Sequence, residues 1–320
     1  MMSTPMSQET PSKTPTTLPL ADALLAIGQG DVSHRVLISF SDLDREKVRN
    51  VRRVWPLIEA ANRVRFVHAL SDLAEASVQY NFNRVFRIAL EDSESSARQY
   101  AVAALWEDAS SDLIDAFIAL LDDESQDVRA EAARALGRYA ALAAEEDISP
   151  ADGERVFAAL LDIAVDETQP YIVRRRAMES IAAFGNRGNV YALIRDAFDH
   201  DDHGMRAGAL FAMGKTLDPG WLNVVTSEFE SDDPEMRFEA ANAAGEIGDS
   251  RAVGGLAALC ADVDPEVRFG AVSALGKIGS PASIRVLRRL AERASGEEKD
   301  AIEEAIRLTE IEFSESMPME

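Results

Sequence analysis

The sequence predicts an all-α protein, an α/α superhelical solenoid of about seven to eight helical hairpins that includes degenerate caps at its ends. The main observation is a phrase that recurs six times: an acidic turn, an apolar residue, an arginine, and a small residue three and six positions later. The arginines of the six copies are Arg98, Arg129, Arg174, Arg206, Arg237 and Arg268. They are separated by 31, 45, 32, 31 and 31 residues. A nearly constant period of this length is typical of stacked repeats.

Each copy of the phrase predicts one amphipathic helix, because positions 0, +3 and +7 from the arginine share one helix face. An apolar run at helical spacing lies upstream of each copy, for example Leu222, Val225 and Phe229, and predicts a first helix. The acidic turn between the two helices supplies Asp as a cap and, in two copies, Pro for the first helical position. A single hairpin cannot bury its apolar face, so neighbouring hairpins must stack. Glycine at +8, in Gly137, Gly214, Gly245 and Gly276, is expected to permit the turn into the next repeat.

The one long step between arginines equals a period plus 14 residues. Residues 140–153 are therefore expected to form a longer connection, with an extension of the second helix and a loop at Ser149 and Pro150. The acidic side chains of this stretch place it in solvent.

Residues 231–248 and 262–279 carry the phrase in its most complete form, acidic turn, Arg, Ala, Ala and Gly. This pattern resembles HEAT repeats, specifically the short HEAT-like repeats of the phycobilisome bilin lyase type, over roughly residues 80–290. The resemblance implies the solenoid fold, and it raises a bilin lyase-like chromophore-attachment subunit as an alternative function. HEAT-like deoxyhypusine hydroxylases resemble this fold as well, but they carry His-Glu dipeptides for a di-iron site. No His-Glu dipeptide occurs in this sequence.

The rest of the chain is assigned by composition. Residues 1–19 are rich in Ser, Thr and Pro without apolar periodicity, so we expect a disordered tail. A single solenoid domain is expected over residues 20–313, with a degenerate cap at 20–79, regular repeats at 80–280 and a C-terminal cap at 281–313. An acidic tail at 314–320 follows. The N-terminal cap is expected to be basic on its surface, with arginines from Arg45 to Arg65 that include Arg63.

The formal net charge of −23 argues against binding to nucleic acid, which requires a basic surface. Acidity favours a protein partner with a basic surface, although acidic turns that only keep the array soluble explain it too. No apolar stretch is long enough to cross a membrane, and no charged-then-apolar leader opens the chain, so we expect a cytoplasmic protein. Cys260 is the only cysteine and lies in an apolar run, where a buried, inert thiol is expected.

No pattern in the sequence indicates catalysis. There is no phosphate-binding glycine loop, nucleophile elbow or Cys/His pair, so no catalytic, cofactor or metal residue is predicted. The segment from His200 to His203 is the only cluster of metal-ligating residue types, and it occupies the place of an ordinary turn between helices. The arginine column is expected to be structural, with each guanidinium bonded to the acidic turns of its own or the next repeat.

Positions +2, +5 and +9 of the second helices share one face and vary between repeats. In HEAT-like solenoids the second helices line the concave side, so this strip is the predicted partner-binding surface. Its residues are Tyr100, Glu107, Glu131, Arg134, Arg138, Arg176, Glu179, Phe211, Lys215, Glu239, Asn242, Glu246, Ser273 and Lys277. We expect Arg134 and Lys215 to be solvated, and Phe238 and Phe269 beside the strip to pack between repeats. The predicted function is a non-enzymatic interaction scaffold or regulatory adaptor. Whether a small molecule such as a bilin binds the same face stays open.

Overall fold

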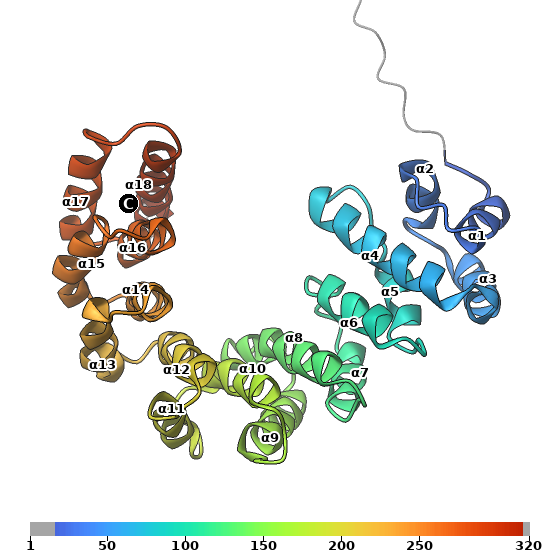
Figure 1. The fold of residues 1–320 in the computed structure, drawn as a ribbon, viewed down its shortest axis with the longest axis horizontal. Coiled ribbons are helices and arrows are strands. Elements are labelled where there is room, and N and C mark those ends of the chain that lie inside the picture. Colours follow the sequence, from blue (N-terminus) through green and yellow to red (C-terminus); the bar gives the residue numbers. More distant parts are fainter. Residues whose placement is uncertain (1–16, 316–320) are drawn as a thin grey trace, which may run out of the picture. The chain divides into compact units, whose positions relative to one another are not determined.

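The computed structural model describes residues 17–315, which hold eighteen α-helices and no strand (Figure 1). This confirms the all-α class. The helices are α1 (Leu20–Gly28), α2 (His34–Leu37), α3 (Arg45–Val54), α4 (Ala60–Ala76), α5 (Asn83–Ala89), α6 (Ser95–Ala104), α7 (Asp112–Leu120), α8 (Gln126–Ala144), α9 (Pro150–Val165), α10 (Tyr171–Ile181), α11 (Val190–Phe198), α12 (His203–Lys215), α13 (Leu222–Ser227), α14 (Pro234–Ile247), α15 (Val253–Leu259), α16 (Pro265–Ile278), α17 (Pro281–Ala291) and α18 (Glu297–Glu315). Short 3₁₀ helices adjoin them at Ile38–Phe40, Trp55–Leu57, Ala182–Phe184, Pro219–Trp221, Glu228–Glu230 and Ser250–Ala252.

The described chain forms two compact units, one that ends at Asp108 and one that begins at Ala109. The prediction of one uninterrupted domain over residues 20–313 stays a prediction. Most of the two predicted tails, residues 1–16 and 316–320, lies outside the described residues.

The first unit contains α1 to α6, and its core is built around aromatic rings. The Phe66 ring lies 4.7 Å from the ring of Phe40 and 6.2 Å from that of Trp55, and all three side chains are buried. The expected basic surface is wrong for one residue. Arg63 is only 7% exposed, because its guanidinium bonds the buried carboxylate of Asp92.

The second unit contains six hairpins, from α7/α8 to α17/α18. Consecutive second helices contact one another in the order α8, α10, α12, α14, α16 and α18. Figure 1 shows the first helices α13, α15 and α17 as one layer and the second helices α14, α16 and α18 as the other. The second helices therefore form a continuous row, and this row carries most of the predicted strip.

The acidic turns cap the second helices as the sequence predicts. Asp202 accepts a hydrogen bond from the Met205 N–H, and Asp233 accepts one from the Glu235 N–H. Asp264 accepts from the N–H groups of Glu266 and Val267. These bonds satisfy amide groups that have no partner within the helix, so they define where each helix begins.

The insertion lengthens two helices, α8 and α9, and it adds no hairpin. Helix α8 continues to Ala144, and α9 begins at Pro150 after a short connection. Ser149 caps α9 by accepting the Asp152 N–H. The predicted extension of the second helix is confirmed, but the longer loop is not, because Ser149 and Pro150 begin α9.

The glycines at +8 have a different role from the one expected. All four lie inside their helices and approach a small residue of the next second helix. A Cβ would lie 2.7 Å from Ser180 Oγ at Gly137, 2.8 Å from Ala243 Cα at Gly214, 2.7 Å from Ala274 Cα at Gly245, and 3.1 Å from Ala305 Cβ at Gly276. The turns are made instead by Gly248 and Gly279, whose φ angles of +74° and +60° suit glycine.

Replacing Gly245 with Ala tests this close contact. The new methyl group would meet the backbone of Ala274, which cannot rotate away, so we expect Gly245→Ala to lower the free energy of unfolding by about 1–3 kcal/mol. Denaturant unfolding measures the change.

The matched control is Gly254→Ala. This glycine is also helical, but a Cβ there meets no atom within 4 Å. We expect a neutral effect or a gain of up to about 1 kcal/mol, because Ala favours helix. Equal losses from both substitutions would contradict the proposed contact.

Candidate functional site

The arginine column ties each second helix to the turn that precedes it. In five copies the Nη1 atom donates to the backbone carbonyl six residues earlier: Arg98 to Asp92 at 2.7 Å, Arg129 to Asp123 at 2.7 Å, Arg206 to His200 at 3.1 Å, Arg237 to Ser231 at 2.8 Å, and Arg268 to Asp262 at 2.9 Å. Carbonyl groups at the end of a first helix lack partners within it, so the arginines satisfy them. Arg174 differs from the other five, since its Nε lies 3.4 Å from the carbonyl oxygen of Ala164.

Arg129 Nε also donates to Gln169 Oε1 of the next repeat at 3.0 Å, and Arg237 and Arg63 bridge to carboxylates of the next repeat. Arg237 binds both carboxylate oxygens of Asp262 at 2.8 and 2.9 Å, and Arg63 binds both oxygens of Asp92 at 2.7 and 2.9 Å. The Arg237 guanidinium lowers the pKa of Asp262. Burial would raise the pKa of Asp92, but hydrogen bonds from Arg63 and its neighbours lower it overall. The sequence analysis did not identify Arg63 as a bridging residue. In both bridges, however, the bound aspartate lies six residues before the arginine of its own repeat, and this spacing is visible in the sequence.

The structure places the predicted strip residues in both units. Tyr100 and Glu107 belong to the first unit, where the Tyr100 ring lies 4.6 Å from the His68 ring and Glu107 is exposed. The other members lie along the row of second helices from α8 to α16 in the second unit.

Most charged side chains of this row are paired with one another. Arg134 Nε lies 2.9 Å from Glu131 within α8. Glu246 on α14 binds Lys277 of α16 at 2.6 Å and approaches Lys215 of α12 at 3.8 Å. Arg134 and Lys215 are exposed, as expected, but each also lies beside a carboxylate of the row. Burial would raise the pKa of Glu246, but the two lysines hold it below its usual value.

Glu179 does not expose its carboxylate to a partner, as a residue of the predicted partner-binding strip would have to. It is 7% exposed, and its two oxygens accept from Arg175 at 2.6 Å and Arg176 at 2.7 Å. Gly208 on α12 makes room for this group, since a Cβ there would lie 2.9 Å from Glu179 Oε1. Glu179 therefore positions the two arginines.

Glu239 on α14 is the exception in this row. It is half-buried and has no hydrogen bond or ion pair within 17–315. Burial and the nearby Glu179 raise its pKa to about 7. Among the predicted strip's carboxylates in the second unit, Glu131, Glu179 and Glu246 each contact a cation, and Glu239 does not.

Two aromatic rings flank this carboxylate along the row. Phe211 is 37% exposed and Phe269 is 38% exposed. Phe269, Ser273 and Lys277 line a groove of about 300 Å³ between α16 and α18, opposite the half-exposed Leu308. Phe238 packs between repeats as expected, with its ring 3.0 Å from the Cβ position of Gly270.

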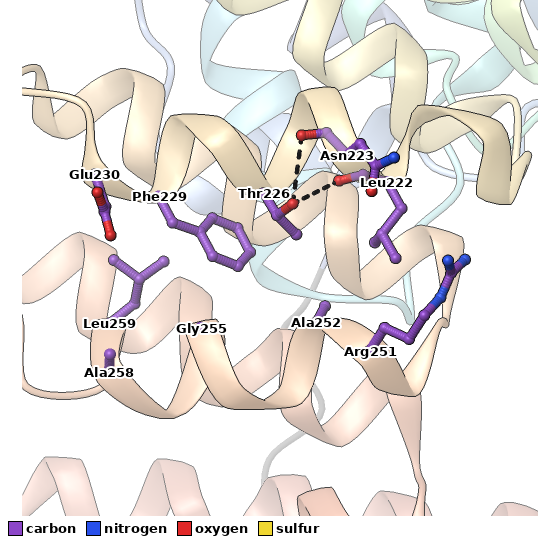
Figure 2. Close-up of a pocket in the computed structure, with 10 residues that line it drawn as sticks. All are labelled: Leu222, Asn223, Thr226, Phe229, Glu230, Arg251, Ala252, Gly255, Ala258 and Leu259. Carbon is purple, nitrogen blue, oxygen red and sulfur yellow. Dashed lines mark hydrogen bonds between the residues drawn. The ribbon is translucent and has the colours of Figure 1, made fainter.

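A second groove, of about 320 Å³, lies in the first-helix layer between α13 and α15 (Figure 2). The Phe229 ring covers Gly255, where a Cβ would lie 2.5 Å from Phe229 Cδ2. The Thr226 hydroxyl donates to the carbonyl of Leu222 in its own helix at 2.9 Å. This groove is a packing feature, because the Thr226 hydroxyl that lines it is already bonded within its own helix.

The described residues contain no group of three His, Cys, Asp or Glu side chains suited to a metal ion. His203 pairs instead with Asp233, 2.5 Å from its Nε2. Cys260 is buried, and this burial raises its pKa to about 12, as expected for an inert thiol. No helix in the described part of the chain has the length and apolarity that a membrane crossing requires.

Comparison with known proteins agrees with this geometry. A family model for HEAT repeats matches residues 83–172 and 222–307. These ranges cover more than half of the chain, which therefore belongs to the HEAT-repeat family. No curated protein matches the chain.

Solved structures show the same fold at low sequence identity. Yeast importin-β (Kap95p) is 15% identical with a TM-score of 0.50, over 89% of this chain and 43% of that one. The complex of CpcE and CpcF of phycocyanin lyase from a Nostoc species is 18% identical with a TM-score of 0.46, over 93% and 100%. Human deoxyhypusine hydroxylase is 16% identical with a TM-score of 0.36, over 91% and 97%. At such identity the likeness to importin-β concerns the fold alone.

The raised pKa of Glu239 predicts a pH-dependent stability. A carboxyl whose folded pKa lies above the ordinary value of 4.5 contributes stability in its protonated form. That contribution is full below about pH 4.5 and is lost as the pH rises to about 7. We expect Glu239→Gln to match the wild type at pH 4.5 and to exceed it by about 1–3 kcal/mol at pH 8.

Thermal melts across this pH range measure the difference. Glu292→Gln, on an exposed position of the same unit, is the control and should leave the pH profile unchanged. Parallel profiles for the wild type and Glu239→Gln would contradict the assignment.

Proposed function

We propose that this chain is a non-catalytic scaffold or adaptor that binds a partner protein with a basic surface along the second helices from α10 to α18. The observation that carries the proposal is Glu239, a half-buried carboxylate without a cation in contact, whereas the strip residues Glu131, Glu179 and Glu246 each have one. A lysine or arginine of the partner would supply that cation.

The surroundings of Glu239 support a protein rather than a small ion as the ligand. Phe211 and Phe269 expose rings on α12 and α16, the two second helices next to α14, and aromatic anchors dominate binding energy at protein interfaces. The groove between α16 and α18 offers a place for an apolar side chain. The net charge of −23 would steer a basic partner toward the chain.

The proposal includes a cytoplasmic location and no nucleic-acid ligand. A single buried thiol suits a reducing compartment, and the acidity opposes a phosphate backbone. The chromophore-attachment alternative depends on the family resemblance alone.

Charge reversal at Glu239 tests the proposal. We expect Glu239→Lys to weaken capture of the basic partner by about tenfold or more, because the new ammonium would stand beside Arg175 and Arg176 and repel the partner's cation. The partner is identified by mass spectrometry after capture on the immobilised wild-type chain, and its Kd for each variant is measured in solution.

Asp162→Lys makes the same kind of charge change on an exposed position of α9, in the first-helix layer. It should leave the Kd within about threefold, since it lies away from the row. Melting curves show whether both variants are folded. Equal losses for the two variants would mean that only net charge matters and would remove the row as the site.

A further inference from the structure

In the bridges of Arg63 and Arg237 to the next repeat, one aspartate performs two tasks. At Asp92 and Asp262, Oδ1 accepts the backbone N–H two residues later at 2.9 Å, which holds the turn. The same carboxylate also binds the arginine of the preceding repeat, Arg63 or Arg237, through two hydrogen bonds. Both bridging aspartates lie six residues before the arginine of their own repeat.

His200 occupies this position in the repeat that follows Arg174, and it performs only the first task. Its Nδ1 accepts the Asp202 N–H at 2.9 Å, which reproduces the turn. With Nδ1 as an acceptor, the neutral ring carries its proton on Nε2 and offers a donor rather than an acceptor. Histidine therefore cannot bind the Arg174 guanidinium as aspartate would.

A pocket of about 540 Å³ lies beside this arginine, between the hairpins α9/α10 and α11/α12. Arg174, His200 and Tyr171 line it on one side, and Leu193, Ala197 and Met205 give it an apolar part. The Tyr171 ring stands edge-on to the His200 ring, 4.8 Å between centroids. Within residues 17–315, the two NH₂ groups of Arg174 and the Tyr171 hydroxyl have no hydrogen-bond partner.

We propose that this pocket binds the carboxylate of an aspartate or glutamate side chain presented by a protein partner, with Arg174 as its bidentate donor. An aspartate side chain is the internal precedent, since it fills the same place beside Arg63 and Arg237. The exposed carboxylates of Glu167 and Asp196 also line the pocket. These two carboxylates would repel a doubly charged phosphate more strongly than they would repel a singly charged carboxylate. The pocket therefore favours a carboxylate as its ligand. This site uses other residues than the predicted strip and takes the opposite charge.

A pair of substitutions at position 200 tests the proposal without removing Arg174. His200→Asp supplies the missing carboxylate, so it should close the bridge to Arg174 and weaken binding of an added carboxylate by about tenfold or more. His200→Asn keeps an acceptor for the Asp202 N–H but adds no anion. It should leave binding within about threefold of the wild type.

The probe is N-acetyl-aspartate N-methylamide, titrated into the full chain at neutral pH. The NMR signal of the Arg174 Nε–H and the backbone amide signals of Tyr171 and His200 report binding. N-acetyl-asparagine N-methylamide is the neutral isostere, and methyl phosphate is the competing anion. We expect the aspartyl probe alone to shift these signals at millimolar concentration.

Each result decides one part of the proposal. Equal binding to wild type and His200→Asp, or equal shifts with the neutral isostere or methyl phosphate, would overturn it. Tighter binding of N-acetylalanine would overturn the side-chain assignment in favour of a chain terminus. Arg174→Gln should abolish the shifts, whereas Arg206→Gln, the next arginine of the column, should retain them. Melting curves establish that these variants are folded.

Discussion

The close approach of neighbouring second helices at the +8 glycines is the contact on which the second unit depends. At Gly214 and Gly245 the facing atom is the Cα of an alanine in the next repeat, so no side chain stands between the two backbones. Backbones this close bring side chains of adjacent repeats within ionic reach. Glu246 can therefore bind Lys215 on one side and Lys277 on the other, and the row of second helices becomes a single charged surface.

The repeated phrase was sufficient to predict the helices, their caps and the extension of α8, because these depend on residues close together in the chain. The contact at the +8 glycines was not predictable in the same way. A glycine near a helix end suits a turn and a close approach equally well, and only the register between repeats decides between them. Gly248 and Gly279 make the turns, three residues later.

The candidate site was predicted in part. Helical spacing placed Glu131, Phe211, Glu239 and Glu246 on one row, since this depends only on the geometry of a single helix. It could not show that Glu246 is neutralised while Glu239 is not, because both outcomes depend on side chains from neighbouring repeats. Arg63 was missed for a related reason. Its helix lacks the phrase, and its role appears only through Asp92 of the next repeat.

The glycine contact also bears on how such an array could change its length. The +8 glycine of one repeat meets the +6 residue of the next repeat. A copy of the phrase that has both Gly at +8 and a small residue at +6 could therefore be duplicated, and the two copies would pack against each other without a further mutation. The copies at Arg129, Arg206, Arg237 and Arg268 meet this condition, and the last three follow one another directly. The copies at Arg98 and Arg174 have Trp106 and Ala182 at +8. We therefore expect the array to tolerate gain or loss of whole repeats by recombination most readily between residues 203 and 279. The hairpins before residue 203 would stay fixed in number and order.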